Sequence, residues 1–266
     1  MSGGEAMSRW LASMTEREGR VRRHAEFVQL EGLVHPTFDP AVHVVRALDL
    51  HEMADWPRVD GLDFGFRAPL AYLWGAVAPD GVLHIVRARY EAGVNTDAHI
   101  YAVLREESCE QCWIGPDDWP ADRWWDRRFS AAESCAACNG TGRKTPEPYA
   151  RAADPADADA RDRWQQLGMP TTAANKARRE GFAAVDRLLE VRDGSPGIVI
   201  HDHPSTAPLR LELSELAWRD PDAGDRSQLT VHRETEVVGA DHAWDALRYL
   251  VMAARQLRLV DYFNEP

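Results

Sequence analysis

RVDGLDFGFRAPLAYLWGAVAPDGVLHIVRARY, residues 58–90, contains the pattern that decides the fold. Three runs rich in apolar, aromatic and β-branched residues follow one another here, at 58–66, 68–78 and 82–90. The sequence Pro79-Asp80-Gly81 separates the last two runs and is a tight-turn signal, because glycine accepts the positive φ that such turns need. The stretch therefore predicts an antiparallel meander of three strands.

Helical and extended patterns alternate through the rest of the chain. Apolar residues at helical spacing predict helices at 95–107, 157–169, 179–192, 208–220 and 241–257. Extended segments are predicted at 148–156, 196–203 and 227–239. A meander followed by alternating helices and strands is typical of an α/β fold with a mixed sheet flanked by helices.

Composition limits the class of protein. The chain has 266 residues, 44% of them hydrophobic, which is enough for one large core or two small ones. Because there is neither an apolar run near 18 residues nor a signal-like N-terminus, we expect no membrane span and a cytoplasmic location. Acidic residues outnumber basic ones 43 to 31, so any affinity for DNA must come from local basic patches or from bound cations.

Ionisable side chains gather at the start of the last predicted helix. Asp241, His242 and Asp245 are spaced so that all three can project toward the same neighbourhood. Asp63 ends the first strand of the meander, and Asp154 ends the strand at 148–156. Two carboxylates at strand ends and one on a late helix are the hard oxygen ligands that a pair of Mg²⁺ or Mn²⁺ ions requires around a phosphate.

Each of these aspartates also has an ordinary structural interpretation. Asp241 is well placed to cap the N-terminus of the helix, and an aspartate beside glycine or proline often ends a strand and begins a turn. Asp245 lies one turn into the helix, where a capping role is less obvious. The joint placement, rather than any one residue, indicates a site.

Four segments of the sequence resemble, in order, the C-terminal nuclease domain of the large terminase subunits of tailed bacteriophages. The resemblance rests on the strand with "DFG", the "DG" hairpin and the terminal "DHAWDALRY", and it covers most of the chain outside residues 109–148. It implies an RNase H-like fold and a metal-dependent endonuclease that cuts double-stranded viral DNA during genome packaging. A full large subunit begins with an ATPase motor, whereas no Walker-type phosphate loop is present here.

The resemblance implies specific roles for residues and specific partners. Asp63, Asp154 and Asp245 would hold two catalytic Mg²⁺ or Mn²⁺ ions, with His242 beside them as a catalytic residue. Asp157 and Asp159 are alternatives to Asp154. The expected partners are double-stranded DNA, a packaging ATPase, the portal and the small terminase subunit, in the cytoplasm of an infected bacterium. Two other functions stay open: a Holliday-junction resolvase-like nuclease, and a non-catalytic zinc-stabilised docking module.

Two C-x2-C pairs lie in the middle of the chain. They consist of Cys109 with Cys112 and Cys135 with Cys138. Two such pairs complete a tetrahedral site for one structural Zn²⁺, since four thiolates leave no open position for water. A redox-active dithiol is the rival interpretation. We expect residues 109–148 to form a zinc-binding insertion within a nuclease domain that consists of residues 58–108 and 149–266. Residues 1–57 are expected to form an N-terminal arm or linker, which resembles the end of a terminase motor domain.

Two basic clusters are the candidates for contacts with DNA phosphates. The first is Arg143 with Lys144, directly after the second cysteine pair. The second comprises Lys176, Arg178 and Arg179, before a predicted helix. Such clusters are often no more than solvated surface, but close to a two-metal site they would bind backbone phosphates.

Overall fold

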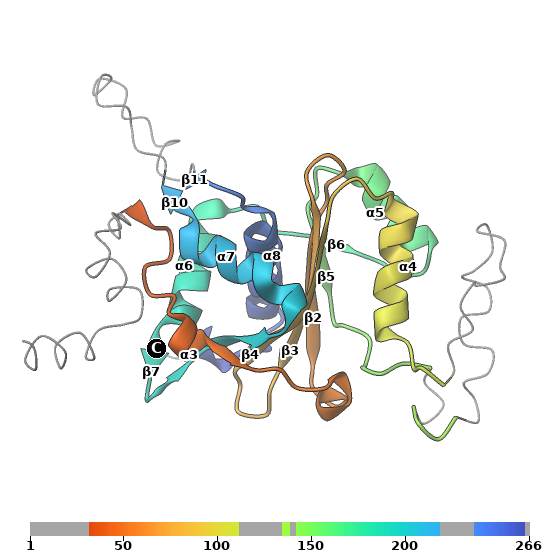
Figure 1. Ribbon diagram of the computed structural model, residues 1–266, viewed down its shortest axis with the longest axis horizontal. Coiled ribbons are helices and arrows are strands. Elements are labelled where there is room, and N and C mark those ends of the chain that lie inside the picture. The colour runs from red at the N-terminus through yellow and green to blue at the C-terminus, as the bar shows by residue number, and fades with distance from the viewer. Residues whose placement is uncertain (1–31, 112–134, 139–141, 219–236, 264–266) are drawn as a thin grey trace, which may run out of the picture.

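The computed structural model describes residues 32–111, 135–138, 142–218 and 237–263 (Figure 1). Its centre is a mixed sheet of seven strands. In sheet order the strands are β1 (Val44–Arg46), β9 (Ile198–Asp202), β4 (Leu83–Glu91), β3 (Leu70–Val77), β2 (Arg58–Asp63), β5 (Arg151–Ala153) and β6 (Thr172–Ala173). The predicted fold class, a mixed α/β sheet flanked by helices, is confirmed.

The predicted meander forms the middle of this sheet. Strands β2, β3 and β4 pair antiparallel, while β5 and β6 continue the sheet in parallel beyond β2, and β9 and β1 continue it in parallel beyond β4. The turn between β3 and β4 is the one that the sequence indicates, with Gly81 at φ 84° and the Val82 amide donating to Asp80 Oδ1 at 3.1 Å. Because β2 and β5 are parallel neighbours, their carboxyl ends meet at one edge of the sheet.

Helices cover both faces of the sheet (Figure 1). On one face lie α4 (Thr96–Glu107) and α5 (Ala158–Gln166), which pack on an apolar cluster that includes Tyr72 and Trp164. The opposite face carries α6 (Arg178–Leu189), α7 (Ala207–Glu215) and α8 (His242–Gln256). The apolar stripe predicted on the last helix faces this second core, where it is buried, and consists of Trp244, Leu247, Val251 and Ala254.

Short elements complete the described structure. They are α3 (Pro40–His43), β7 (Val191–Arg192), β8 (Ser195–Pro196), β10 (Ala217–Trp218), β11 (Val237–Val238) and three 3₁₀ turns at Leu50–Met53, Pro204–Thr206 and Asp261–Phe263. β1 belongs to the central sheet although it lies in the segment expected to be an arm or linker; three residues are too few for an alternating pattern to reveal a strand. No helix in the described ranges is long and apolar enough to cross a membrane.

Two glycines let α8 lie directly on the sheet. A Cβ atom on Gly61, in β2, would overlap the carbonyl oxygen of Ala246 in α8. A Cβ atom on Gly75, in β3, would lie 2.9 Å from a methyl carbon of Leu250. Because Gly61 is two residues before Asp63 and Ala246 is one turn after His242, this close approach brings the start of α8 against the end of β2.

Candidate functional site

Asp63 is the last residue of β2, and Asp154 directly follows the last residue of the neighbouring parallel strand β5. The register pairs Leu62 with Ala153, so the next residue on each strand is one of the two aspartates. The Asp154 amide donates to the carbonyl oxygen of Leu62 at 3.1 Å, which continues the pairing to the sheet edge. The backbones that carry the two carboxylates are therefore about 5 Å apart, the spacing of adjacent strands.

The start of α8 adds His242 and Asp245 to this edge. His242 Nδ1 lies 3.1 Å from Asp63 Oδ2, so a protonated Nδ1 donates to the carboxylate. Asp63 is only 8% exposed, and burial raises the pKa of its carboxyl group. The hydrogen bond from His242 lowers this pKa, but the negative charges of Asp245 and Asp154 raise it further. Asp245 and Asp154 thus lie close enough for their charges to act on Asp63.

Arg248 of α8 holds Asp245, and Tyr249 of the same helix lies near Asp154. Asp245 Oδ1 accepts hydrogen bonds from Arg248 Nε at 3.0 Å and from a terminal nitrogen of the same guanidinium at 2.8 Å. Arg248 is 1% exposed and passes over Gly181 of α6, where a side chain would overlap it. Partial burial raises the pKa of Asp154, and the contact with Lys176 and, more weakly, the nearby Tyr249 hydroxyl lower it. Burial, followed by the charges of the nearby aspartates, raises the pKa of Tyr249, so this phenol stays protonated as a donor.

The alternatives to Asp154 have different surroundings. Asp157 caps α5, accepting from the amide of Ala160 at 2.9 Å, and Asp159 is exposed in the first turn of that helix. Both line an open pocket of about 440 Å³ together with Asp154 and Phe64. Of the three, Asp154 is the one whose charge reaches Asp63 strongly enough to raise the pKa of that group.

Asp241 occupies the N-cap position of α8, but its side chain makes no capping hydrogen bond. It lies 3.6 Å from a guanidinium nitrogen of Arg178 instead. The sequence predicts that Asp241 caps the helix by accepting a hydrogen bond from an amide of the first turn. The structure shows no such hydrogen bond, so this prediction is wrong. The physical reason lies in the backbone: Asp241 has φ −132° and ψ 11°, outside the extended conformation from which an N-cap side chain normally reaches the first-turn amides.

The donor set suits a hard divalent cation. Carboxylate oxygens are the ligands that Mg²⁺ and Mn²⁺ prefer, and mutual repulsion among buried carboxylates is relieved by a cation between them. Within the described ranges, however, no three carboxylate or imidazole ligand atoms lie within 4.8 Å of one another. Asp63, Asp154 and Asp245 each contact a basic side chain of the protein, namely His242, Lys176 and Arg248 in that order.

The two predicted basic clusters lie in different places. Lys176 contacts Asp154 and Arg178 contacts Asp241, so these two residues border the acidic site, while Arg179 is exposed on α6. Arg143 and Lys144 are adjacent to the other end of β2, about 17 Å away along the strand. The structure therefore does not bring this first cluster to the carboxylates.

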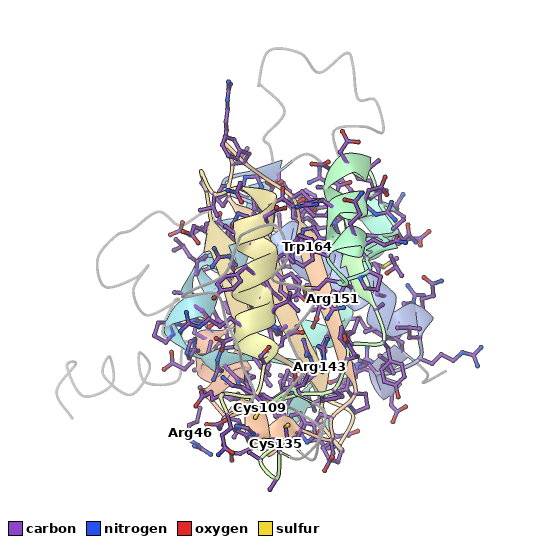
Figure 2. The ribbon with its side chains drawn as sticks, turned by 90° about the vertical axis from the view of Figure 1, so that its right-hand side faces the viewer. Arg46, Cys109, Cys135, Arg143, Arg151 and Trp164 are labelled. Atoms are coloured by element: carbon purple, nitrogen blue, oxygen red, sulfur yellow. The ribbon has the colours of Figure 1, made fainter. Side chains whose placement is uncertain are left out.

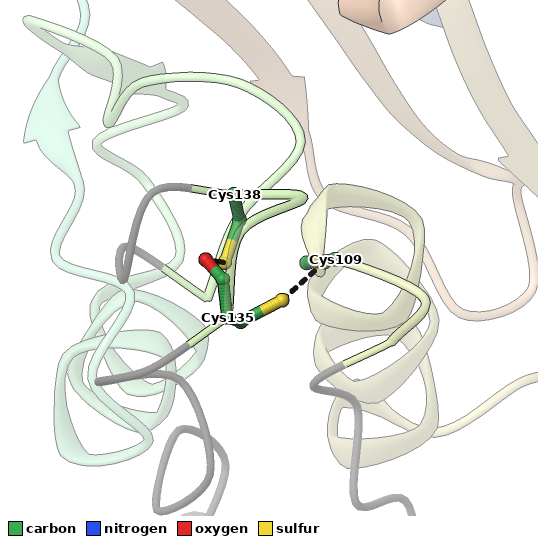
Figure 3. A group of neighbouring side chains, drawn as sticks. All are labelled: Cys109, Cys135 and Cys138. Carbon is green, nitrogen blue, oxygen red and sulfur yellow. Dashed lines mark hydrogen bonds between the residues drawn. The ribbon is translucent and has the colours of Figure 1, made fainter.

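Three of the four cysteines form a compact cluster (Figure 3). The sulfur atoms of Cys109, Cys135 and Cys138 all lie within 4.8 Å of one another, with 4.0 Å between the first two. Sulfur atoms around a tetrahedral Zn²⁺ are about 3.8 Å apart, given Zn–S bonds of about 2.3 Å. The Gly142 amide donates to Cys138 Sγ at 3.2 Å, a contact that stabilises a thiolate. Cys112 lies outside the described residues, as do the Trp-rich residues that follow it.

A buried network of charges joins this cluster to the sheet. Glu107, at the end of α4, accepts from Arg58 at 2.9 Å, from Trp74 at 3.1 Å, from Arg143 at 3.1 Å and from Arg151 at 3.3 Å. Figure 2 shows Arg143 between the cysteines and Arg151, on the face covered by α4. No sequence pattern indicates this network, because a single glutamate at the end of a helix looks the same in the sequence whether it is buried or at the surface.

Comparison with solved structures identifies the fold. The large terminase of a thermophilic bacteriophage, in complex with ATP-gamma-S, matches with a TM-score of 0.55 and 18% sequence identity, over 83% of this chain and 45% of that chain. The chain shares its fold with a phage large terminase. The same phage protein in complex with ADP matches with a TM-score of 0.54 and 20% identity, over 83% and 44% of the two chains.

A looser match is the nuclease domain of the large terminase from bacteriophage SPP1, with bound Mn, at a TM-score of 0.48 and 15% identity over 79% of this chain and 94% of that domain. This chain spans less than half the length of the large terminase from the thermophilic phage. No protein-family model and no curated protein sequence matches it. The expected resemblance to large terminases is confirmed at the level of fold.

Proposed function

We propose that the protein is a metal-dependent endonuclease of the terminase type, which cuts double-stranded viral DNA during genome packaging. The observation that carries the proposal is the convergence of Asp63, Asp154 and Asp245 where β2 and β5 end and α8 begins. The shared fold with a large terminase supports the same function. No specific feature of the described site favours cleavage of branched DNA or a purely docking role.

The roles of the residues follow from their surroundings. Asp63, Asp154 and Asp245 hold two divalent ions, Mg²⁺ or Mn²⁺, which when bound activate water and stabilise the leaving oxygen of a phosphodiester. His242 orients Asp63 through the contact at 3.1 Å and can move a proton at Nδ1. Arg248 fixes Asp245 through two hydrogen bonds to Oδ1. Lys176, Arg178 and Arg179 contact the DNA backbone.

The proposed partners follow from the same likeness. The phage large terminase that shares the fold was solved with ATP-gamma-S and with ADP, and this chain covers less than half of it. We therefore propose that an ATPase, in the same polypeptide or in a separate chain, presents DNA to the site, and that the portal and the small terminase subunit complete the packaging assembly. The reaction would take place in the cytoplasm of an infected bacterium.

Cleavage of supercoiled plasmid tests the proposal. Wild-type protein is expected to nick or linearise the plasmid with Mn²⁺ or Mg²⁺ and to leave it intact with EDTA. Asp245→Ala should lose most of this activity, because the carboxylate on α8 is one of the three ligands. Gel electrophoresis of the products measures both effects. Failure of the wild-type protein to cut under any of these conditions would contradict nuclease activity in the isolated chain and favour a docking module.

The cysteine cluster is proposed to bind one structural Zn²⁺, with Cys112 as the fourth ligand. The sulfur positions of Cys109, Cys135 and Cys138 leave one corner of a tetrahedron for it. Metal analysis of the purified protein should give about one zinc per chain, and removal by a chelator should lower the melting temperature. Cys109→Ser should bind less zinc. Zinc-free protein with four reactive thiols and an unchanged melting temperature would contradict this site.

A further inference from the structure

Lys176 makes an unusual contact with Asp154. Its ammonium nitrogen lies 2.8 Å from Oδ1 and 3.2 Å from Oδ2, so it straddles both oxygens of the carboxylate. A divalent cation bound to Asp154 would have to approach the same carboxylate oxygens. The contact also lowers the pKa of Asp154, against the effect of partial burial, which raises it. The ammonium therefore occupies a position where a metal ion would be expected.

The other two carboxylates are held differently. His242 approaches one oxygen of Asp63, and Arg248 approaches one oxygen of Asp245, so each leaves its second oxygen available. Arg248 is 1% exposed and is fixed between helices α6 and α8, whereas the side chain of Lys176 is 48% exposed. A flexible lysine stem at the surface can swing away at little cost, but the buried arginine cannot.

We propose that Lys176 is a built-in competitor for the divalent cation at Asp154, which must be displaced before the site can bind metal. The inference rests on the proposed metal site of Asp63, Asp154 and Asp245. Once displaced, the ammonium remains at the rim of the site, where it can bind a phosphodiester oxygen of the substrate. Lys176 is thus a positioning residue that links the arrival of metal to the arrival of the DNA backbone.

Binding of Mn²⁺ alone, measured by the electron paramagnetic resonance signal of the free ion, tests the proposal in the zinc-containing full chain. Lys176→Met should bind Mn²⁺ about fivefold more tightly than wild type, which is the gain expected when a partly exposed ion pair no longer has to be broken. Arg67→Met is the matched control, because Arg67 is an exposed cation four residues after Asp63. The Arg67→Met substitution removes one positive charge, as Lys176→Met does, but it does not free the Asp154 carboxylate.

A double-mutant cycle separates the possible outcomes. In an Asp154→Asn background, Lys176→Met should no longer tighten Mn²⁺ binding, because the contact through which it acts is gone. If Lys176→Met behaves like Arg67→Met in the wild-type background, the inference is overturned although the metal site stands. If neither wild type nor Lys176→Met binds Mn²⁺, the proposed metal site itself is wrong.

Discussion

Asp63→Asn is expected to reduce DNA cleavage by about 10³-fold while leaving the protein at least as stable as the wild type. Asp63 is the most buried of the three carboxylates, and the charges of the other two both act on it. Asparagine keeps the shape of the side chain and can still accept from His242, but it lacks the negative charge that binds a divalent ion. The loss should therefore be one of chemistry and not of fold.

The effect on stability has a definite sign. The pKa of Asp63 is raised in the folded protein, so above its unfolded pKa the ionised carboxylate opposes folding. Removing the charge should leave the melting temperature at neutral pH unchanged or higher. Plasmid cleavage with Mn²⁺ measures the first effect, and thermal unfolding of the zinc-containing protein without added Mg²⁺ or Mn²⁺ measures the second. Asp162→Asn, on the exposed surface of α5, is the control and should change neither. Full cleavage by Asp63→Asn would refute the site.

Glu107→Gln should lower the free energy of unfolding by about 3–5 kcal/mol, the usual cost of breaking a buried ion pair from one side. The substitution keeps the volume of the side chain but leaves Arg58 and Arg151, which are 2% and 3% exposed, with much less negative charge around them. Arg143 also loses one of its carboxylate partners, at 3.1 Å, and keeps Glu147. Urea unfolding, in the presence of zinc, measures the change.

The matched control for this variant is the preceding residue on the same helix. Glu106→Gln makes the same chemical change at a partly exposed position outside the network, and it should alter stability by no more than about 0.5 kcal/mol. Equal effects of the two substitutions would contradict a structural role for the network.

The stability difference between wild type and Glu107→Gln should also depend on pH. Burial by itself would raise the pKa of Glu107, but the charges of Arg58, Arg151 and Arg143 outweigh it and lower the pKa to about 2. Because the pKa of Glu107 is lower in the folded protein, its ionised carboxylate stabilises the fold above the unfolded pKa, near 4.5. That stabilisation is lost as the pH falls toward 2. Urea unfolding of both proteins at several pH values across this range should show the difference shrinking.

Much of the fold follows from local sequence patterns. The meander and its Asp80-Gly81 turn, the helix that Asn95 caps through the Ala98 amide, and the buried stripe on α8 all appear where the sequence places them. Each depends on residues that are close together in the chain. The parallel pairing of β1 with β9 could not be predicted, because it joins two short strands that are distant in sequence and depends on packing throughout the domain.

The candidate site was predictable as a set of positions but not as a set of contacts. Strand ends and a helix start indicate where Asp63, Asp154 and Asp245 lie, and the structure brings them to one edge of the sheet. Their catalytic and metal-binding roles stay a prediction. The contact of Lys176 with Asp154 left no signal in the sequence, since a lysine in a basic cluster looks the same whether it faces solvent or a carboxylate.

The backbone pairing beside the cysteines has a consequence for how the chain folds. Ser108 pairs with Arg143, and the Cys109 amide donates to Gly142, so both ends of the stretch 109–142 are held together. Once this stretch is closed, it no longer adds to the length of chain that must be ordered before β5 can find β2. Because the entropy of loop closure grows with loop length, early closure at the cysteines lowers the barrier to the most distant strand pairing beside the acidic site. The cluster would then influence the rate at which the sheet assembles, in addition to the stability of the finished fold.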